Sequence, residues 1–441
     1  MKPKNSLRIP HSLPSGEQPS KPMRILFLND LHDPRIGSSI RLMYQEAREL
    51  RARGHETLVV TCTNKREEEG TTTIEGCEIR RIYSNYPARF RAWVSINNRG
   101  VVSKVRRIYQ EWKPDVVHSH LIHANLSYAS LTEARKAGAG VVFTAHDSQT
   151  FCYQKLDCFH GGEEHNWEKK EYKAHWSKCI PCQRFRYRPG RNALIRKVMS
   201  RDVQRVTVVS DELGRAIEAN GIRVHRTVNN AIELQERMPT SEEITAFKER
   251  FGLTGKRVIA MGGRLHVLKG IEQLFQMMAV LREEFPDLRL LVMGRESVYE
   301  GFAPRAREHG VDELVVPTGW LEGNDLLCAY GAIDVMAGPS ICFETFGMVS
   351  LEAMEFEKPV VVTSFGGCPE AVHHGEWGSV ANPYRIDEFS ERIAEFLRDP
   401  ELSARMGRNG RAQLSERFSI AHMTDLFLEE YEAAIAAVRG L

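Results

Sequence analysis

The stretch "MRILFLNDLHDPRIGSSIRLMYQEARELRARG" (23–54) decides the fold, because it joins a buried strand to an amphipathic helix. Its first eight residues are almost continuously apolar, which is typical of a strand covered on both faces in a parallel sheet. Four apolar residues then fall at helical spacing: Ile40, Met43, Ala47 and Leu50. Gly54 is a suitable end for that helix. A strand followed by such a helix indicates a Rossmann-like α/β unit.

The same alternation continues and divides the chain into two halves. The apolar runs of the first half are ETLVVTC (56–62), PDVVHSH (114–120), VVFTAHD (141–147) and RVTVVSD (205–211). Those of the second half are KRVIAMGGR (256–264), LRLLVMGR (288–295), ELVVPTGW (313–320), IDVMAGPS (333–340) and KPVVVTSFGG (358–367). Because these runs are β-branched and bounded by turn residues, they predict two Rossmann-like α/β/α domains that face each other across a cleft.

Changes in composition place the boundaries. The polar, Pro-containing segment at 229–245 is the expected linker between an N-terminal domain (23–228) and a C-terminal domain (246–418). A final amphipathic helix at 419–441 is followed by no strand, and we expect it to pack back on the N-terminal domain. Residues 1–22 are rich in Pro, Ser and Lys and lack the apolar core of a signal peptide, so they predict a disordered tail.

Bulk composition limits the class of protein. The chain has 441 residues, which favours two domains over a single core, and its 42% hydrophobic content is ordinary for a globular protein. No apolar run approaches the roughly 18 to 20 residues of a spanning helix. Nine cysteines, an odd number, argue against a fully disulfide-bonded secreted protein. We therefore expect a cytoplasmic protein.

The net charge of +2 conceals a difference between the two halves. Residues 1–228 hold 39 Lys and Arg against 24 Asp and Glu, an excess of 15 positive charges. Residues 229–441 hold 21 against 34, an excess of 13 negative charges. This asymmetry indicates that the first half faces an anionic partner, either nucleic acid or an anionic membrane surface. Attraction between the two halves is the simpler alternative.

A glycine-rich loop, "GGRLHVLKG" (262–270), follows the first strand of the second half. Gly262 and Gly263 permit close backbone approach, and Arg264 and Lys269 can then point at one anion. Two cations on such a loop suit a diphosphate, because the guanidinium binds two oxygens and the ammonium adds a point charge. If the diphosphate is a leaving group, its growing charge would be stabilised there. The alternative is an ordinary basic surface loop.

The segment "PSICFETFGMVSLEAM" (339–354) places Glu344 and Glu352 eight residues apart. On a continuous helix this spacing separates two residues by about 12 Å along the axis. A glycoside hydrolase needs carboxyls that face each other about 5 to 9.5 Å apart, so we expect these two to contact different parts of one long ligand. Helical spacing in "MVSLEAMEF" puts Glu344 in the turn before a helix, where free backbone N–H groups attract phosphate. An amphipathic core helix with two exposed acids is the alternative.

Taken together, the glycine loop with Arg and Lys and the later Glu-x7-Glu pattern resemble family 4 retaining glycosyltransferases of the GT-B class. Further similarity lies in "VVSDELG" (208–214), "VNNAIE" (228–233) and "TSFGGCPEAV" (363–372). The resemblance covers residues 23–430 and is strongest over 255–385. It implies transfer of a sugar from a nucleotide-sugar donor with retention of configuration, and with no cofactor or metal required for catalysis.

The resemblance also assigns roles to individual residues. Arg264 and Lys269 would stabilise the departing diphosphate. Glu344 would contact the donor sugar, and Glu352 the ribose hydroxyls. The other donor-binding positions that it implies are Gly263 and the backbone amides of Phe346, Gly347 and Met348. In the N-terminal domain, His146 matches a histidine that approaches the donor sugar, and Gly37 of "RIGSSIR" matches a glycine-rich loop near phosphate and acceptor, with Gly-Ser-Ser replacing the usual paired glycines.

An insert at 150–190 carries four cysteines: Cys152, Cys158, Cys179 and Cys182. "CIPC" has the close spacing of a zinc knuckle, and the insert resembles the cysteine-rich segment of some bacterial polysaccharide glycosyltransferases. A structural zinc would fold a segment that has little apolar content, whereas reduced free thiols are the alternative. The basic segment that follows, 184–205, suggests contact with anionic lipid headgroups; a solvated helix and nucleic-acid contact are the alternatives.

The sequence thus predicts a cytoplasmic retaining glycosyltransferase at the inner face of the cytoplasmic membrane. It would move a sugar from a nucleotide-sugar donor to a glycan or lipid-linked acceptor in the synthesis of cell-surface polysaccharide or glycoconjugate, and we expect no nucleic-acid partner. A nucleotide-sugar epimerase or hydrolase of the same architecture is one alternative. A non-catalytic sugar-nucleotide binding module is another.

Overall fold

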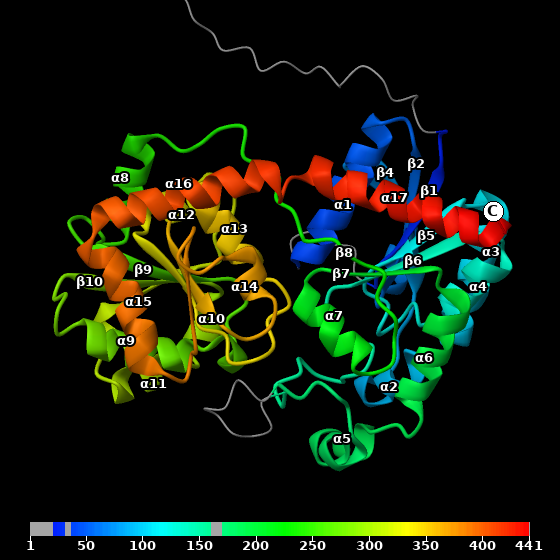
Figure 1. Cartoon of the computed structure of the whole chain (residues 1–441), viewed down its shortest axis with the longest axis horizontal. Helices are drawn as coiled ribbons and strands as arrows, with labels where there is room; N and C mark the ends of the chain where they lie inside the picture. Colours follow the sequence, from blue (N-terminus) through cyan, green and yellow to red (C-terminus); the bar gives the residue numbers. More distant parts are fainter. Residues whose placement is uncertain (1–20, 31–36, 160–169, 441) are drawn as a thin grey trace, which may run out of the picture.

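The computed structural model describes residues 21–30, 37–159 and 170–440. Two α/β domains lie side by side, and two C-terminal helices run along one edge of both (Figure 1). This is the two-domain architecture that the alternating pattern predicts. The expected tail at 1–22 falls almost entirely outside the described residues.

An eight-stranded sheet forms the centre of the N-terminal domain, in the order β3-β4-β2-β1-β5-β6-β7-β8. Its strands are β1 (Arg24–Leu28), β2 (Glu56–Thr63), β3 (Gly70–Ile74), β4 (Cys77–Tyr83), β5 (Val116–Ser119), β6 (Gly140–Ala145), β7 (Arg205–Val208) and β8 (Arg226–Thr227). Its helices are α1 (Ser38–Ala52), α2 (Arg91–Val94), α3 (Arg99–Trp112), α4 (Ala129–Lys136), α5 (Trp176–Gln183), α6 (Arg191–Asp202) and α7 (Asp211–Glu218). Neighbouring strands are parallel except for the β3–β4 hairpin.

The β3–β4 hairpin is a part of the sheet that the apolar runs did not predict. It turns at Glu75 and Gly76, whose φ angles are 51° and 73°. β3 is Thr-rich and none of its residues is buried, because it forms the outer edge of the sheet. An edge strand has one exposed face and no need of a continuous apolar run, so its sequence resembles a loop.

A six-stranded parallel sheet forms the C-terminal domain, in the order β11-β10-β9-β12-β13-β14. The strands are β9 (Arg257–Gly262), β10 (Leu288–Met293), β11 (Val315–Gly319), β12 (Val335–Gly338), β13 (Val360–Thr363) and β14 (Ser379–Ala381). Along the chain the sheet grows from β9 to one side and then from β12 to the other. The direction of winding therefore reverses between β9 and β12, which is where open α/β sheets bind ligands.

Helices cover both faces of the second sheet. They are α8 (Ser241–Arg250), α9 (Ile271–Leu281), α10 (Glu296–Tyr299), α11 (Ala303–Glu308), α12 (Gly323–Ala332), α13 (Met348–Glu355), α14 (Cys368–Ala371), α15 (Ile386–Arg398) and α16 (Pro400–Glu416). α8 begins inside the segment expected as linker, because Thr240 and Glu243 form a capping box that starts the helix there.

The last helix, α17 (Ile420–Arg439), returns to the N-terminal domain and packs on its sheet, as the sequence predicts (Figure 1). Arg205 of β7 binds Glu430 through both carboxylate oxygens, at 2.6 and 3.1 Å. At Gly140 of β6, a Cβ atom would lie 2.9 Å from the backbone of Ala434. The helix can approach the strand this closely only because position 140 has no side chain. Among the described residues, none of the helices has the length and apolarity that crossing a bilayer requires.

Candidate active site

Two loops meet at the reversal point of the C-terminal sheet. The first follows β9 and contains Gly263, whose φ of 96° is in the region that favours glycine. It ends at Gly270, where a Cβ would lie 1.8 Å from the carbonyl oxygen of Pro339 in the second loop. The Ile341 N–H donates to the Leu268 carbonyl at 3.0 Å. The glycine loop and the 339–347 loop are therefore packed against each other as one unit.

An ion pair between Lys269 and Glu344 lies at this junction. The Lys269 ammonium donates to the Glu344 carboxylate, and the Ser340 hydroxyl donates to the same oxygen at 3.2 Å. The two side chains are 26% and 16% exposed, so water screens the pair only in part. Burial opposes both charges, but the partners outweigh it: the pKa of Lys269 rises and the pKa of Glu344 falls from their ordinary values. Both groups are charged at neutral pH.

The helix α13 begins beside this pair. Gly347 precedes it with a φ of 87°, and a Cβ there would lie 2.9 Å from the Cys368 sulfur. The Phe346 ring is buried and packs on Phe418, so only its backbone can serve a ligand. The N–H groups of Met348 and Val349 in the first turn of α13 have no acceptor within the helix, whereas that of Ser350 donates to the Gly347 carbonyl at 3.0 Å. A cavity opens here, lined among others by Gly262, Lys269, Ser340, Glu344, Gly347 and Ser350.

Glu352 lies in a different cavity from Glu344. It accepts a hydrogen bond from Arg41 of α1 at 2.6 Å and another from Tyr330 of α12 at 2.6 Å. This cavity is lined by Arg41, Gln235, Tyr330, Glu352, Glu355 and Phe356, among others. Arg41 belongs to the N-terminal domain, and it was not singled out from the sequence because nothing in its own segment indicates a partner that is 311 residues away. Gly37 precedes α1 in extended conformation, at the edge of the described residues.

On the N-terminal side, His146 follows the end of β6. Its Nε2 shares a hydrogen bond of 2.8 Å with Nδ1 of His120, which follows β5. Burial lowers the pKa of His146 to about 4, so its ring is neutral at neutral pH. The carboxylate of the next residue, Asp147, lies 3.3 Å from Nε2 of His123, and this partner helps to hold the pKa of Asp147 at about 2 in spite of burial.

Contacts between the domains surround the site. The Ser210 hydroxyl donates to the Thr345 carbonyl at 2.7 Å. Glu370 accepts hydrogen bonds from the N–H groups of Asp211 and Glu212 at 2.6 and 2.8 Å, where α7 begins. A carboxylate is favoured at that position by the helix dipole. The segments 208–214 and 363–372, which carried part of the sequence resemblance, therefore join the two domains.

The insert after His146 also contacts the C-terminal domain. The ring of Phe159 packs against Phe343 and Phe365, with centroids 5.9 and 5.1 Å apart. Burial and the nearby Lys269 lower the pKa of Lys155, and Arg264 adds to this effect. Lys155 therefore lies near the proposed diphosphate residues, although no motif in its segment indicated such a position.

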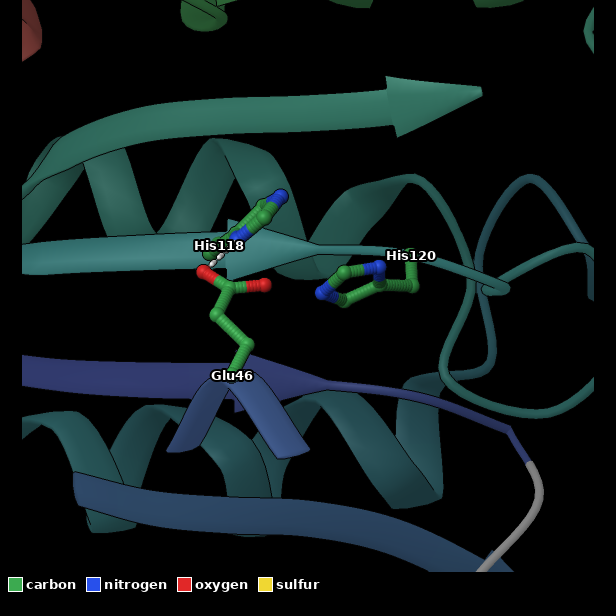
Figure 2. A group of neighbouring side chains, drawn as sticks. All are labelled: Glu46, His118 and His120. Carbon is green, nitrogen blue, oxygen red and sulfur yellow. Dashed lines mark ion pairs between the residues drawn. The ribbon is translucent and has the colours of Figure 1, made fainter. Parts of the chain in front are cut away.

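The four cysteines of the insert are unpaired. Burial raises the pKa values of Cys152, Cys158 and Cys179, and neighbouring thiols of the same set contribute to each increase. In the described part of the chain, however, the group of three potential metal ligands within 4.8 Å of one another is Glu46, His118 and His120, not the cysteines (Figure 2). Zinc binding by the cysteines would require their sulfur atoms to lie closer together, and it stays a prediction.

Sequence comparison gives matches in both domains. The profile of "Glycosyltransferase Family 4" matches residues 41–236, and that of "Glycosyl transferases group 1" matches residues 243–413. The two facing Rossmann-like domains have the GT-B fold. The chain belongs to family 4 of the GT-B glycosyltransferases.

Individual proteins agree with this family. A D-inositol 3-phosphate glycosyltransferase of Saccharomonospora viridis is 33% identical over 258 residues, which are 56% of this chain and 57% of that protein. A GDP-mannose-dependent phosphatidylinositol monomannoside mannosyltransferase of Mycolicibacterium smegmatis is 31% identical over 39% of this chain and 47% of its own length. These alignments thus span about half of each relative.

Solved structures share the fold over nearly the whole chain. Anabaena HepE in complex with UDP and glucose has a TM-score of 0.69 at 19% identity, covering 93% of this chain and 100% of that one. Sucrose-phosphate synthase from Thermosynechococcus elongatus has a TM-score of 0.73 at 16% identity, covering 94% and 100%. At these identities the similarity shows the fold alone.

Proposed function

We propose that the chain transfers a sugar from a nucleotide-sugar donor to a glycan or lipid-linked acceptor, with retention of configuration, in the synthesis of a cell-surface glycoconjugate. Family membership supports the reaction class, and HepE has been solved with UDP and with UDP-glucose. The observation that carries the proposal is the cavity where Lys269, Glu344 and the start of α13 converge at the reversal point of the C-terminal sheet.

The charges in this cavity suit a donor with a diphosphate. Lys269 in the cavity and Arg264 on the same glycine loop would stabilise the negative charge that grows on the leaving diphosphate, and the first N–H groups of α13 would donate to its oxygens. Glu344, kept ionised by Lys269, would accept hydrogen bonds from sugar hydroxyls. Glu352, in the neighbouring cavity, would accept from the ribose hydroxyls.

The proposed route to retention is front-side attack. Glu344 and Glu352 line different cavities, so they do not form the facing carboxyl pair of a glycosidase. In the proposed step the acceptor oxygen forms a bond to the anomeric carbon while the bond to the diphosphate breaks. A phosphate oxygen of the leaving group takes the acceptor proton, so no metal or protein base is required.

A release assay tests the function against its alternatives. Purified protein is incubated with UDP-glucose, GDP-mannose and other nucleotide sugars, with and without inositol phosphate or lipid-linked acceptors. We expect nucleotide release that depends on acceptor, together with a product that retains the anomeric configuration. Release without acceptor would indicate an epimerase or hydrolase instead, and binding without release would indicate a non-catalytic module.

We also propose that the N-terminal domain contacts the anionic face of the cytoplasmic membrane, where a lipid-linked acceptor would be found. Three aromatic side chains are strongly exposed: Trp93 at 51%, Trp176 at 62% and Phe185 at 78%. They belong to α2, to α5 and to the turn after α5, which lie at the same end of the domain (Figure 1). Arg188 lies 4.4 Å from the Trp93 ring and donates to its carbonyl, which ties these segments together.

Aromatic rings mixed with arginines suit the boundary of an anionic bilayer. Sedimentation with vesicles that contain anionic lipid tests this contact. A double variant with Ser in place of Trp93 and Phe185 should bind the vesicles about tenfold more weakly, because the loss of each ring removes apolar area that the membrane would bury. The matched control is Trp320→Ser, an exposed tryptophan of the other domain. Equal binding by both variants would contradict the proposed contact.

A further inference from the structure

A buried chain of polar groups connects the C-terminal helix α17 with His146. Tyr431 of α17 donates to the Glu46 carboxylate of α1, and its oxygen lies 2.7 Å from Nδ1 of His118. Nε2 of His118 lies 2.7 Å from the Thr144 hydroxyl. Because the Tyr431 proton goes to Glu46, the oxygen of Tyr431 accepts from Nδ1–H of His118. The chain of donors therefore runs from His118 through Tyr431 and ends at Glu46 as the final acceptor.

His120 lies between Glu46 and His146. Its ring points toward the Glu46 carboxylate (Figure 2), and a ring nitrogen lies within 4.8 Å of a carboxylate oxygen. Nδ1 of His120 is occupied by the 2.8 Å hydrogen bond to Nε2 of His146, so the nitrogen that faces Glu46 is Nε2. Neither Nε2 of His120 nor Nδ1 of His146 has a hydrogen-bond partner, although both atoms are buried.

Only one proton can occupy the bond between the two histidines. Burial lowers the pKa of His120 well below 6.5 and that of His146 to about 4, so both rings are neutral. In one arrangement Nδ1–H of His120 donates to Nε2 of His146. The other nitrogen of His120, Nε2, then has no proton and directs a lone pair at Glu46. In the other His146 donates from Nε2, so that His120 carries its proton on Nε2 and directs that N–H toward the carboxylate.

The carboxylate favours the second arrangement. A lone pair facing an anion is repelled, whereas an N–H dipole facing it is attracted, and low dielectric strengthens both effects. We propose that Glu46, acting through His120, holds His146 in the Nε2–H tautomer, so that Nδ1 of His146 presents a lone pair. Glu46 and His120 are then positioning residues for His146.

This tautomer has a consequence for sugar binding, which rests on the proposed function. Nδ1 of His146 is buried in the structure. Where a sugar hydroxyl reaches this atom, a bare Nδ1 can accept its hydrogen bond and cannot donate one. His146 would therefore select a hydroxyl proton rather than an acceptor oxygen on the donor sugar. In the opposite tautomer Nδ1 of His146 carries the proton, so it would donate to the oxygen of a sugar hydroxyl instead of accepting from it.

A metal ion held by Glu46, His118 and His120 is the competing explanation for this cluster. Both ring nitrogens of His118 already have partners, and Glu46 already accepts from Tyr431. A metal would break a hydrogen bond of His118, although Glu46 could bind it through its other oxygen, so the hydrogen-bonded network accounts for more of the contacts. One equivalent of metal that is lost in Glu46→Gln would overturn the proposal.

NMR of the full chain with 15N-labelled histidine tests the proposal directly, because nitrogen shifts distinguish the two tautomers. Single replacements of His120 and His146 assign the signals. We expect His146 of the native protein to be protonated on Nε2 alone. An Nδ1–H tautomer, or a doubly protonated ring, at pH 7 would overturn the proposal without reference to any enzymatic assay, so its failure is distinguishable from failure of the proposed function.

The variant Glu46→Gln provides a second test of the proposal. Its amide can donate to Nε2 of His120, which should shift both histidines to the Nδ1–H form and raise the donor KM about tenfold with a smaller change in turnover, because a hydrogen bond to the bound sugar is lost. Glu49→Gln is the matched control: it removes the same charge from α1, at a surface pair with Arg53 2.8 Å apart. An unchanged His146 tautomer in folded Glu46→Gln would contradict the proposal; if that variant does not fold, the native spectrum decides.

Discussion

In the C-terminal domain, the groups of the candidate site come from two short segments, 262–270 and 339–348, whereas the groups around His146 come from elements as distant as α1 and α17. Lys269 and Glu344 are 75 residues apart, and each lies within a recognisable motif. Tyr431 and Glu46 are 385 residues apart, and neither lies in one. Loops that follow neighbouring strands are brought together by the sheet itself, but the His146 surroundings depend on how a terminal helix packs.

Because of this contrast, substitutions in the C-terminal cavity and substitutions around His146 should affect different properties of the protein. Loss of a charge in the C-terminal cavity should reduce chemistry in a folded protein. Changes to the buried polar groups that lie next to His146 should alter the protonation of its ring and the stability of the N-terminal domain. Each of the following measurements tests one side of the comparison.

Lys269→Ala should have the largest effect. We expect turnover to fall about 10²- to 10³-fold, because a cation beside a leaving diphosphate acts mainly in the transition state. Nucleotide affinity, measured by calorimetry, should fall much less. Lys256→Ala, in the same domain, is the control. Equal losses in turnover and affinity would contradict a leaving-group role.

His146 should make stability depend on pH. Its folded pKa is about 4 against an ordinary value of 6.5, so between these values the unfolded chain binds more protons than the folded chain. The free energy of unfolding should therefore rise with pH across this window, by about 3 kcal/mol from this group. Urea unfolding of His146→Asn should give a flatter pH profile than the native chain. Parallel profiles would show that His146 is not held neutral by burial.

Gly140→Ala tests how far the N-terminal side depends on α17. The added Cβ would lie 2.9 Å from the backbone of Ala434, so the helix must shift. Overpacking of this kind should cost about 1–3 kcal/mol, measured by urea unfolding. Gly100→Ala is the control, since a Cβ there meets nothing within 4 Å. Similar stabilities for the two variants would mean that α17 tolerates displacement.

We propose that the cysteine insert binds one structural zinc. Loss of this metal should have the smallest effect on the stability of the whole chain. Elemental analysis of protein purified without chelator should find about one zinc per chain. Cys182→Ser should lose the metal and lower Tm by about 2–4 °C, whereas Cys62→Ala, outside the insert, should retain the metal. Protein free of zinc would leave the four cysteines as ordinary thiols.

The sequence predicted the fold well because buried parallel strands are long apolar runs. The ten apolar runs each correspond to a strand, whereas the polar edge strand β3 was not predicted. Lys269, Glu344 and the start of α13 could be selected because each lies in a short recognisable motif, and the loops that carry them follow the neighbouring strands β9 and β12. Arg41, Lys155 and Tyr431 could not, because their partners are set by domain packing rather than by neighbours in the chain.

The central claim is that Lys269 and Arg264 neutralise a sugar-bound diphosphate in the cleft, and a crystal structure with a bound nucleoside diphosphate tests it most directly. We predict the diphosphate oxygens within hydrogen-bond distance of the Lys269 ammonium and the Arg264 guanidinium, beside the first turn of α13. A nucleotide bound with its diphosphate away from both cations would contradict the account.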